Sequence, residues 1–139
     1  MAVWQADFQV LLPVQDLPAD YRQALAQLLP PAKSWSTQLE VWGTEAGDRI
    51  DVFSEDNVPV EMFARFDLRA WNAPLYERFL AFVSAVGARL QSDTGMAISV
   101  TPDPFRQALL GSRAAAFVRD PEAYIRDLRD HPIRMPDEP

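Results

Sequence analysis

Every second residue is apolar in the stretch from residue 60 to residue 71, VEMFARFDLRAW. Its apolar row consists of Met62, Ala64, Phe66, Leu68 and Ala70. A period of two residues indicates a β-strand, because successive side chains point to opposite sides of a sheet. We therefore predict the longest strand of the protein here, in a sheet that is covered on one face only.

Two shorter alternating stretches precede this strand, at residues 35–42 and 48–53. Their predicted inward rows are Thr37, Leu39 and Val41 in the first and Ile50 and Val52 in the second. The connections, GTEAG and SEDNVP, are short and rich in turn-forming residues. Short connections join antiparallel neighbours, so the three strands are predicted to form a meander.

The remaining elements give the order β-α-β-β-β-α-β-α-α. They are a strand at 6–14, a helix that starts at Pro18 or Asp20 and ends at Pro30, a helix at 75–91, a central strand at 96–100, and helices at 104–118 and 121–130. Amphipathic helices must bury their apolar stripes, and the meander offers one apolar face. We therefore predict an α+β fold, a two-layer sandwich with a mainly antiparallel sheet. Residues 1–131 form a single domain, and residues 132–139 form a frayed C-terminal tail.

Composition excludes several kinds of chemistry. The chain has no cysteine, its five glycines are scattered, and its one histidine, His131, precedes a proline near the end. Thiolate chemistry, glycine-rich phosphate loops and two-histidine metal motifs are therefore ruled out. We predict no catalytic residue, no metal site and no cofactor, and a non-enzymatic function is favoured over an enzyme.

The net charge of −7 bears on partners and location. An acidic chain is a poor candidate for nucleic-acid binding, because neutralising phosphates supplies most of that affinity. No stretch approaches the roughly 18 apolar residues that span a bilayer, and no secretory signal is visible at the N-terminus. We predict a cytoplasmic protein with neither a nucleic-acid nor a membrane partner.

Acidic residues concentrate between residues 40 and 61, where the sequence has seven carboxylates and one basic residue, Arg49. They are Glu40, Glu45, Asp48, Asp51, Glu55, Asp56 and Glu61. One interpretation is a solvated hairpin region. The other is a patch for a basic partner, since a field of one sign steers association.

The polar row of the predicted meander contains the candidate binding residues. It carries Gln38, Glu40 and Trp42, then Arg49, Asp51 and Phe53, then Phe63, Arg65, Asp67, Arg69 and Trp71. If Ile50 pairs with Phe66, Asp51 lies opposite Arg65 and Arg49 opposite Asp67. Opposite charges across a sheet stabilise it by roughly 0.2–1 kcal/mol per pair, which is a sufficient structural reason for those four.

A functional interpretation of this row remains open as well, because exposed aromatics beside arginines are typical of protein-binding hot spots. The predicted binding residues are Trp42, Arg49, Asp51, Arg65, Asp67, Arg69 and Trp71. The cross-strand charge pairs do not explain Arg69 and Trp71, and Trp42 is their predicted neighbour. Alternatively, the last two helices fold over this face and bury it.

Four stretches resemble the layout of a family of small bacterial proteins without an established activity. They are WG at 42–43, GDRIDV at 47–52, ARFDLR at 64–69 and SRAAAFVRDPEAYI at 112–125. Some small acidic α+β proteins of this general kind serve as immunity proteins that block a toxin, an analogy of size, charge and fold.

Three functional hypotheses follow. The first is a non-enzymatic protein-binding domain, such as an immunity protein or an adaptor. The second is a small-ligand-binding protein or enzyme with Arg65, Asp67 and Arg69 in a pocket, which a flat sheet face would count against. The third is a homodimer formed through a sheet edge or the aromatic face.

Overall fold

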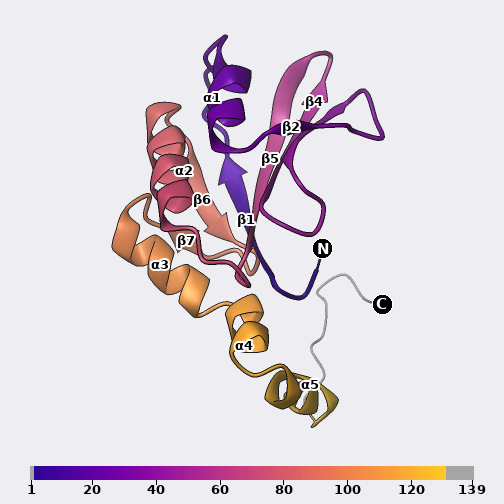
Figure 1. Ribbon diagram of the computed structural model, residues 1–139. Coiled ribbons are helices and arrows are strands. Elements are labelled where there is room, and N and C mark those ends of the chain that lie inside the picture. Colours follow the sequence, from indigo (N-terminus) through magenta and orange to yellow (C-terminus); the bar gives the residue numbers. More distant parts are fainter. Residues whose placement is uncertain (1, 131–139) are drawn as a thin grey trace.

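The computed structural model describes residues 2–130, which form one layer of sheet and one of helices (Figure 1). The seven strands are β1 (Gln5–Leu11), β2 (Pro31–Ala32), β3 (Leu39–Gly43), β4 (Arg49–Glu55), β5 (Val58–Asp67), β6 (Arg89–Ser92) and β7 (Ala97–Ile98). They form one antiparallel sheet in the order β2-β3-β4-β5-β1-β6-β7. The fold is an α+β sandwich, as predicted, and β3-β4-β5 form the predicted meander.

Five helices accompany the sheet: α1 (Tyr21–Leu28), α2 (Ala73–Ala85), α3 (Pro102–Leu110), α4 (Arg113–Arg119) and α5 (Pro121–Asp130). The core lies between one sheet face and α1, α2, α3 and α4. Phe66 of β5 is at its centre, with its ring centroid 5.0 Å from that of Phe79 in α2 and 5.7 Å from that of Phe105 in α3. All three rings are fully buried, so Phe66 joins the sheet to α2 and α3 at the centre of the core.

The predicted alternation of β5 is confirmed up to Leu68, whereas Ala70 of the predicted apolar row is exposed and lies beyond the strand, which was predicted to run to residue 71. Met62, Ala64 and Phe66 are completely buried, Leu68 is nearly so, and the residues between them are less buried. The strand ends at Asp67, and a turn then leads to Asn72, whose side-chain oxygen accepts a hydrogen bond from the N–H of Leu75 at 3.2 Å. This cap, followed by Pro74, starts α2 where the sequence predicted a helix.

The predicted helix at 75–91 is wrong beyond residue 85. Gly87 has a φ of +73°, its N–H bonds to the carbonyl of Ser84, and the N–H of Ala88 bonds to the carbonyl of Val83. This pair of bonds is the Schellman motif that ends helices at a left-handed glycine. The chain reverses there, and Leu90, predicted to belong to the helix stripe, is buried in β6 beside β1.

Two further predictions of the C-terminal half are wrong. The strand predicted at 96–100 is not central: β7 spans two residues at the sheet edge, and Met96 before it is largely exposed. The helix predicted at 104–118 is two helices, because Ser112 caps α4 by accepting from the N–H of Ala115 at 3.2 Å. An apolar run and a helical period do not reveal such local breaks.

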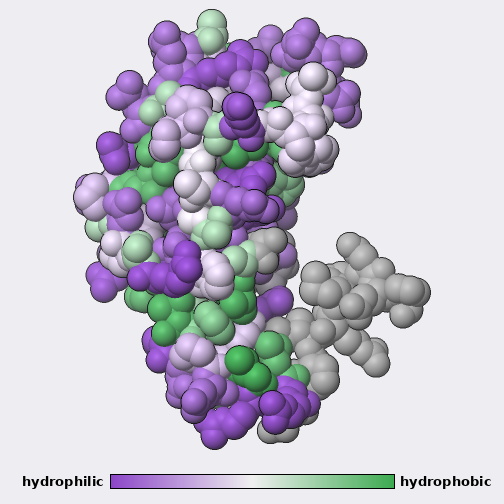
Figure 2. All heavy atoms as spheres, turned by 45° about the vertical axis from the view of Figure 1, so that its right-hand side comes forward, coloured by the Kyte–Doolittle hydropathy of each residue, from purple (hydrophilic) through white to green (hydrophobic). Residues whose placement is uncertain are grey.

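One alternative was that the last two helices fold over the polar face of the meander and bury it. In the structure they do not cover this face. Ala114 and Ala115 of α4 join the core. α5 packs on α4, where the rings of Phe117 and Tyr124 lie 5.7 Å apart, and Ile125 stays half-exposed. Figure 2 shows hydrophilic residues over most of the upper surface and more hydrophobic ones in the lower part, where α3, α4 and α5 lie.

The predictions made for His131 and for residues 132–139 lie outside the described residues. Within residues 2–130, no helix combines the length and the apolar character needed to cross a bilayer.

Candidate functional site

The structure places Trp42 in the core and not on the polar face. Trp42 pairs with Ile50 and Glu40 with Val52, so both side chains of β3 point to the helix-covered side. Trp42 is 4% exposed, whereas Leu39 and Val41 lie on the face without helices. The predicted faces of β3 are therefore reversed. Leu39, Val41 and Trp42 put apolar residues in both rows, and a shift of one residue inverts a strand.

The predicted pairing of β4 with β5 is wrong by two residues. Ile50 lies opposite Ala64, so Arg49 faces Arg65 and Asp51 faces Phe63. Like charges directly opposite destabilise a sheet. Each arginine instead has its own carboxylate: Arg49 Nε lies 2.6 Å from Asp51 Oδ1, and Arg65 Nε lies 3.7 Å from Oδ1 of Asp7 on β1.

These two ion pairs differ in quality. Asp51 is 4% exposed and accepts a hydrogen bond from Arg49. Asp7 Oδ1 and Arg65 Nε are both inaccessible to solvent, and neither makes a hydrogen bond in the described part of the chain. Burial raises the pKa of the Asp7 carboxyl, and the Arg65 guanidinium offsets only part of that rise. Arg49, Asp51 and Arg65 therefore take part in ion pairs within the sheet.

Arg69 and Asp67 hold the β3–β4 turn. Arg69 Nε and Nη2 donate to the two oxygens of Asp67, both at 2.9 Å, and Nη2 also reaches the carbonyl of Ala46 at 3.2 Å. The guanidinium lies 4.0 Å from the ring centroid of Trp4, whose Nε1–H donates to the same carbonyl at 2.7 Å. These hydrogen bonds lower the pKa of Asp67. Trp4, Ala46, Asp67 and Arg69 thus form a structural clamp at this corner of the sheet. The sequence analysis missed Trp4 because this residue precedes the first predicted strand.

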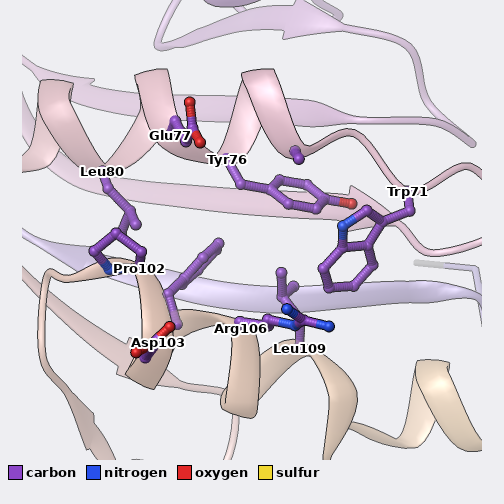
Figure 3. A pocket seen from close by; sticks show the side chains of 10 residues that line it. Trp71, Tyr76, Glu77, Leu80, Pro102, Asp103, Arg106 and Leu109 are labelled. Carbon is purple, nitrogen blue, oxygen red and sulfur yellow. The ribbon is translucent and has the colours of Figure 1, made fainter.

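Trp71 points away from this clamp toward the helices. Its side chain is 46% exposed, and its ring meets that of Tyr76 edge-on, with centroids 5.0 Å apart. Trp71 closes one end of a hollow of about 210 Å³ between α2 and α3 (Figure 3). We call this hollow the α2–α3 groove; it is lined by Trp71, Ala73, Tyr76, Glu77, Leu80, Pro102, Asp103, Phe105, Arg106 and Leu109.

The groove has an apolar floor and a charged mouth. Leu80, Phe105 and Leu109 are buried. Glu77 from α2 and Asp103 from α3 are exposed on opposite walls, with Arg106 one turn beyond Asp103 (Figure 3). Within residues 2–130, none of these three charged side chains takes part in an ion pair. The mouth therefore carries charge that the fold does not use.

Tyr76 is a buried residue with an unused hydroxyl. It is 5% exposed, and its oxygen has no hydrogen-bond partner among the described residues. Burial raises the pKa of Tyr76, and the carboxylates of Asp48 and Asp67 add to the rise. The backbone N–H of Asn72 approaches the phenol oxygen and offsets part of this, without reaching hydrogen-bond geometry.

Of the seven predicted binding residues, Trp71 is the one that lines the α2–α3 groove. The groove residues Glu77, Asp103 and Arg106 were missed, because nothing in the sequence indicates that α2 and α3 pack side by side. A helix capped by Asn72 places Trp71 just before the cap and Tyr76 at the fourth helical position, the pair that packs together in a hydrophobic staple, and this was a usable signal for that contact.

A second hollow, of about 800 Å³, opens between β1, the β6–β7 turn, α3, α4 and Tyr124 of α5. Arg65, Asp67 and Arg69 line neither of these two hollows. Residues 2–130 also contain no group of three or more carboxylates or histidines placed to hold a metal ion.

Comparisons with protein-family models, with curated proteins and with solved structures give no match for this chain. The resemblance to a family of small bacterial proteins therefore stays a prediction, and function has to be argued from the geometry alone.

Proposed function

We propose that this domain binds another protein, and that the α2–α3 groove receives a side chain of that partner. One observation carries the proposal: a half-exposed tryptophan stands at the mouth of a hollow of about 210 Å³ with a buried apolar floor. Tryptophan is enriched among residues that dominate binding energy, and such residues pair with pockets on the other partner.

The size of the groove favours a side chain over a free small molecule. Sites for drug-sized ligands usually have volumes of roughly 300–1,000 Å³, above that of this groove. The polar residues of the predicted site point the same way, since Arg49, Asp51, Asp67 and Arg69 are engaged in internal hydrogen bonds. An immunity protein or an adaptor would use such a groove for recognition without any reaction.

The test is affinity purification of the tagged protein from its native cells, followed by binding measurements with each recovered partner. We expect Trp71→Ala to weaken at least one complex about 30-fold or more, the effect of losing a hot spot of about 2 kcal/mol. Trp35→Ala is the matched control, because Trp35 is 82% exposed and does not line the groove. Equal losses for the two variants, or none for Trp71→Ala, would refute the proposal.

A further inference from the structure

We propose that the partner side chain held by the α2–α3 groove is basic, with arginine the best fit. This inference rests on the proposed function and adds the chemistry of the partner. Its first support is charge: Glu77 and Asp103 stand on opposite walls of the mouth, and neither has an ion-pair partner within residues 2–130 (Figure 3). Arg106 balances one of them, which leaves the mouth with an excess of negative charge.

The second support is the aromatic end of the groove. A guanidinium stacks on aromatic faces, and indole is the best such surface. This chain already uses that contact twice, with Arg69 4.0 Å from the ring centroid of Trp4 and Arg22 4.7 Å from that of Tyr21. The half-exposed ring of Trp71 has no guanidinium stacked on it among the described residues.

The third support is the floor. An arginine carries three methylene groups between backbone and guanidinium, and such stems bury well along apolar surface while the head stays near water. Leu80, Phe105 and Leu109 offer this surface below the charged mouth. A volume of about 210 Å³ has room for one side chain of this kind. The overall charge of −7 favours approach of a basic partner as well.

Arg106 makes the proposal sensitive to the sign of charge. As a cation at the same mouth, it opposes the entry of a second cation. Removing it should therefore strengthen binding of a basic group. If the groove instead held an acidic or a purely apolar side chain, the same substitution would weaken binding or leave it unchanged.

The probe is N-acetyl-arginine amide, compared with N-acetyl-citrulline amide, its neutral isostere. Binding to the full chain is followed by NMR through the indole N–H of Trp71, assigned with Trp71→Phe. We expect a saturable shift with the arginine probe and up to about fivefold weaker binding of citrulline, the effect of an exposed ion pair worth up to about 1 kcal/mol. Glu77→Gln combined with Asp103→Asn should abolish this preference, and Arg106→Ala should increase affinity for arginine.

The outcomes separate the two proposals. The proposal of a basic side chain is overturned if both probes bind equally, or if Arg106→Ala weakens arginine binding or leaves it unchanged. If Trp71→Ala disrupts a partner complex while the double carboxylate variant leaves it unchanged, the proposed function stands and this inference is refuted. All substituted side chains are exposed, and a thermal melt confirms that each variant is folded.

Discussion

The guanidinium of Arg69 lies 4.0 Å from the ring centroid of Trp4, and both side chains donate hydrogen bonds to the carbonyl oxygen of Ala46. A residue before β1, a residue after β5 and the turn between β3 and β4 therefore meet at one point. Asp48, in the same turn, accepts the N–H of Asp67 at 2.8 Å. Hydrogen bonds at Ala46 and at Asp48 therefore fix the β3–β4 turn, although the turn carries few apolar residues of its own.

Trp4→Ala should reduce the free energy of unfolding by about 2 kcal/mol, because it removes a half-buried ring and the donor to Ala46. Arg69→Ala should also lower stability, and the β3–β4 turn should then exchange its amide hydrogens faster. Chemical denaturation and hydrogen exchange measure the two effects. Arg106→Ala is the control, since Arg106 lies outside this corner. Unchanged exchange in residues 44–48 for both corner variants would contradict the clamp.

Gly87→Ala and Gly43→Ala should differ sharply, although both glycines have a positive φ. A Cβ at Gly87 meets no atom within 4 Å, so its cost is the backbone conformation alone, about 1–2 kcal/mol. A Cβ at Gly43 would run into the carbonyl oxygen of Asp48, so we expect a larger loss or failure to fold. Thermal melts of the two variants decide the point, and equal melting temperatures would contradict it.

Asp7→Asn should stabilise the protein at neutral pH and have no such benefit in acid. The pKa of Asp7 is raised above 3.8 in the folded protein, so ionisation opposes folding. This penalty is absent well below pH 3.8, grows as pH rises past it, and is complete above the folded-state pKa. Denaturation measured from pH 3 to pH 7 should show that the free energy of unfolding of the variant, relative to that of the parent, increases as pH rises.

Asp67→Asn is the opposite case. Hydrogen bonds from Arg69 hold the pKa of Asp67 below 3.8, so the ionised carboxylate stabilises the fold. That contribution is present above pH 3.8 and is lost as pH falls through the folded-state pKa. The variant should be less stable than the parent at pH 7, and the difference should shrink in strong acid. Parallel curves at all pH values would show that Asp67 does not act through its charge.

Tyr76→Phe should leave stability unchanged or raise it by up to about 1 kcal/mol. Removing a buried hydroxyl that has no partner removes a desolvation cost without breaking a hydrogen bond. Urea denaturation of the two proteins provides the comparison, with Tyr21→Phe as the control, because the Tyr21 hydroxyl contacts Glu40 at 3.4 Å. A loss above about 1 kcal/mol for Tyr76→Phe would mean that its hydroxyl is satisfied.

The alternation of residues 60–68 was enough to predict β5 and its buried row, because one clean period has one interpretation. The α+β class was predicted from the amphipathic helices together with the meander. The face of β3 could not be predicted in the same way, since Leu39, Val41 and Trp42 make both rows apolar. The β4–β5 register depended on guessed charge pairs, and the true partner of Arg65 was Asp7, on a strand far away in sequence. Strand order and helix packing set such contacts, and neither is visible in local periodicity.

The candidate site shows the same limit. Trp71 was singled out because no cross-strand ladder explains it, and it lies beyond the end of β5. Its environment could not be predicted, because Phe105 and Arg106 come from a helix that lies some 30 residues further along the chain. Trp42 was proposed as a neighbour on the assumption of a shared face, and that assumption failed with the face of β3.

The sheet ends on both sides in a strand of two residues, β2 with Pro31 and β7 with Ala97 and Ile98. An exposed strand edge recruits other chains by offering unpaired N–H and C=O groups, and proline removes one of the donors. Edges this short offer few such groups to a neighbouring molecule. The wide sheet is therefore poorly suited to growth by the addition of a strand from another molecule.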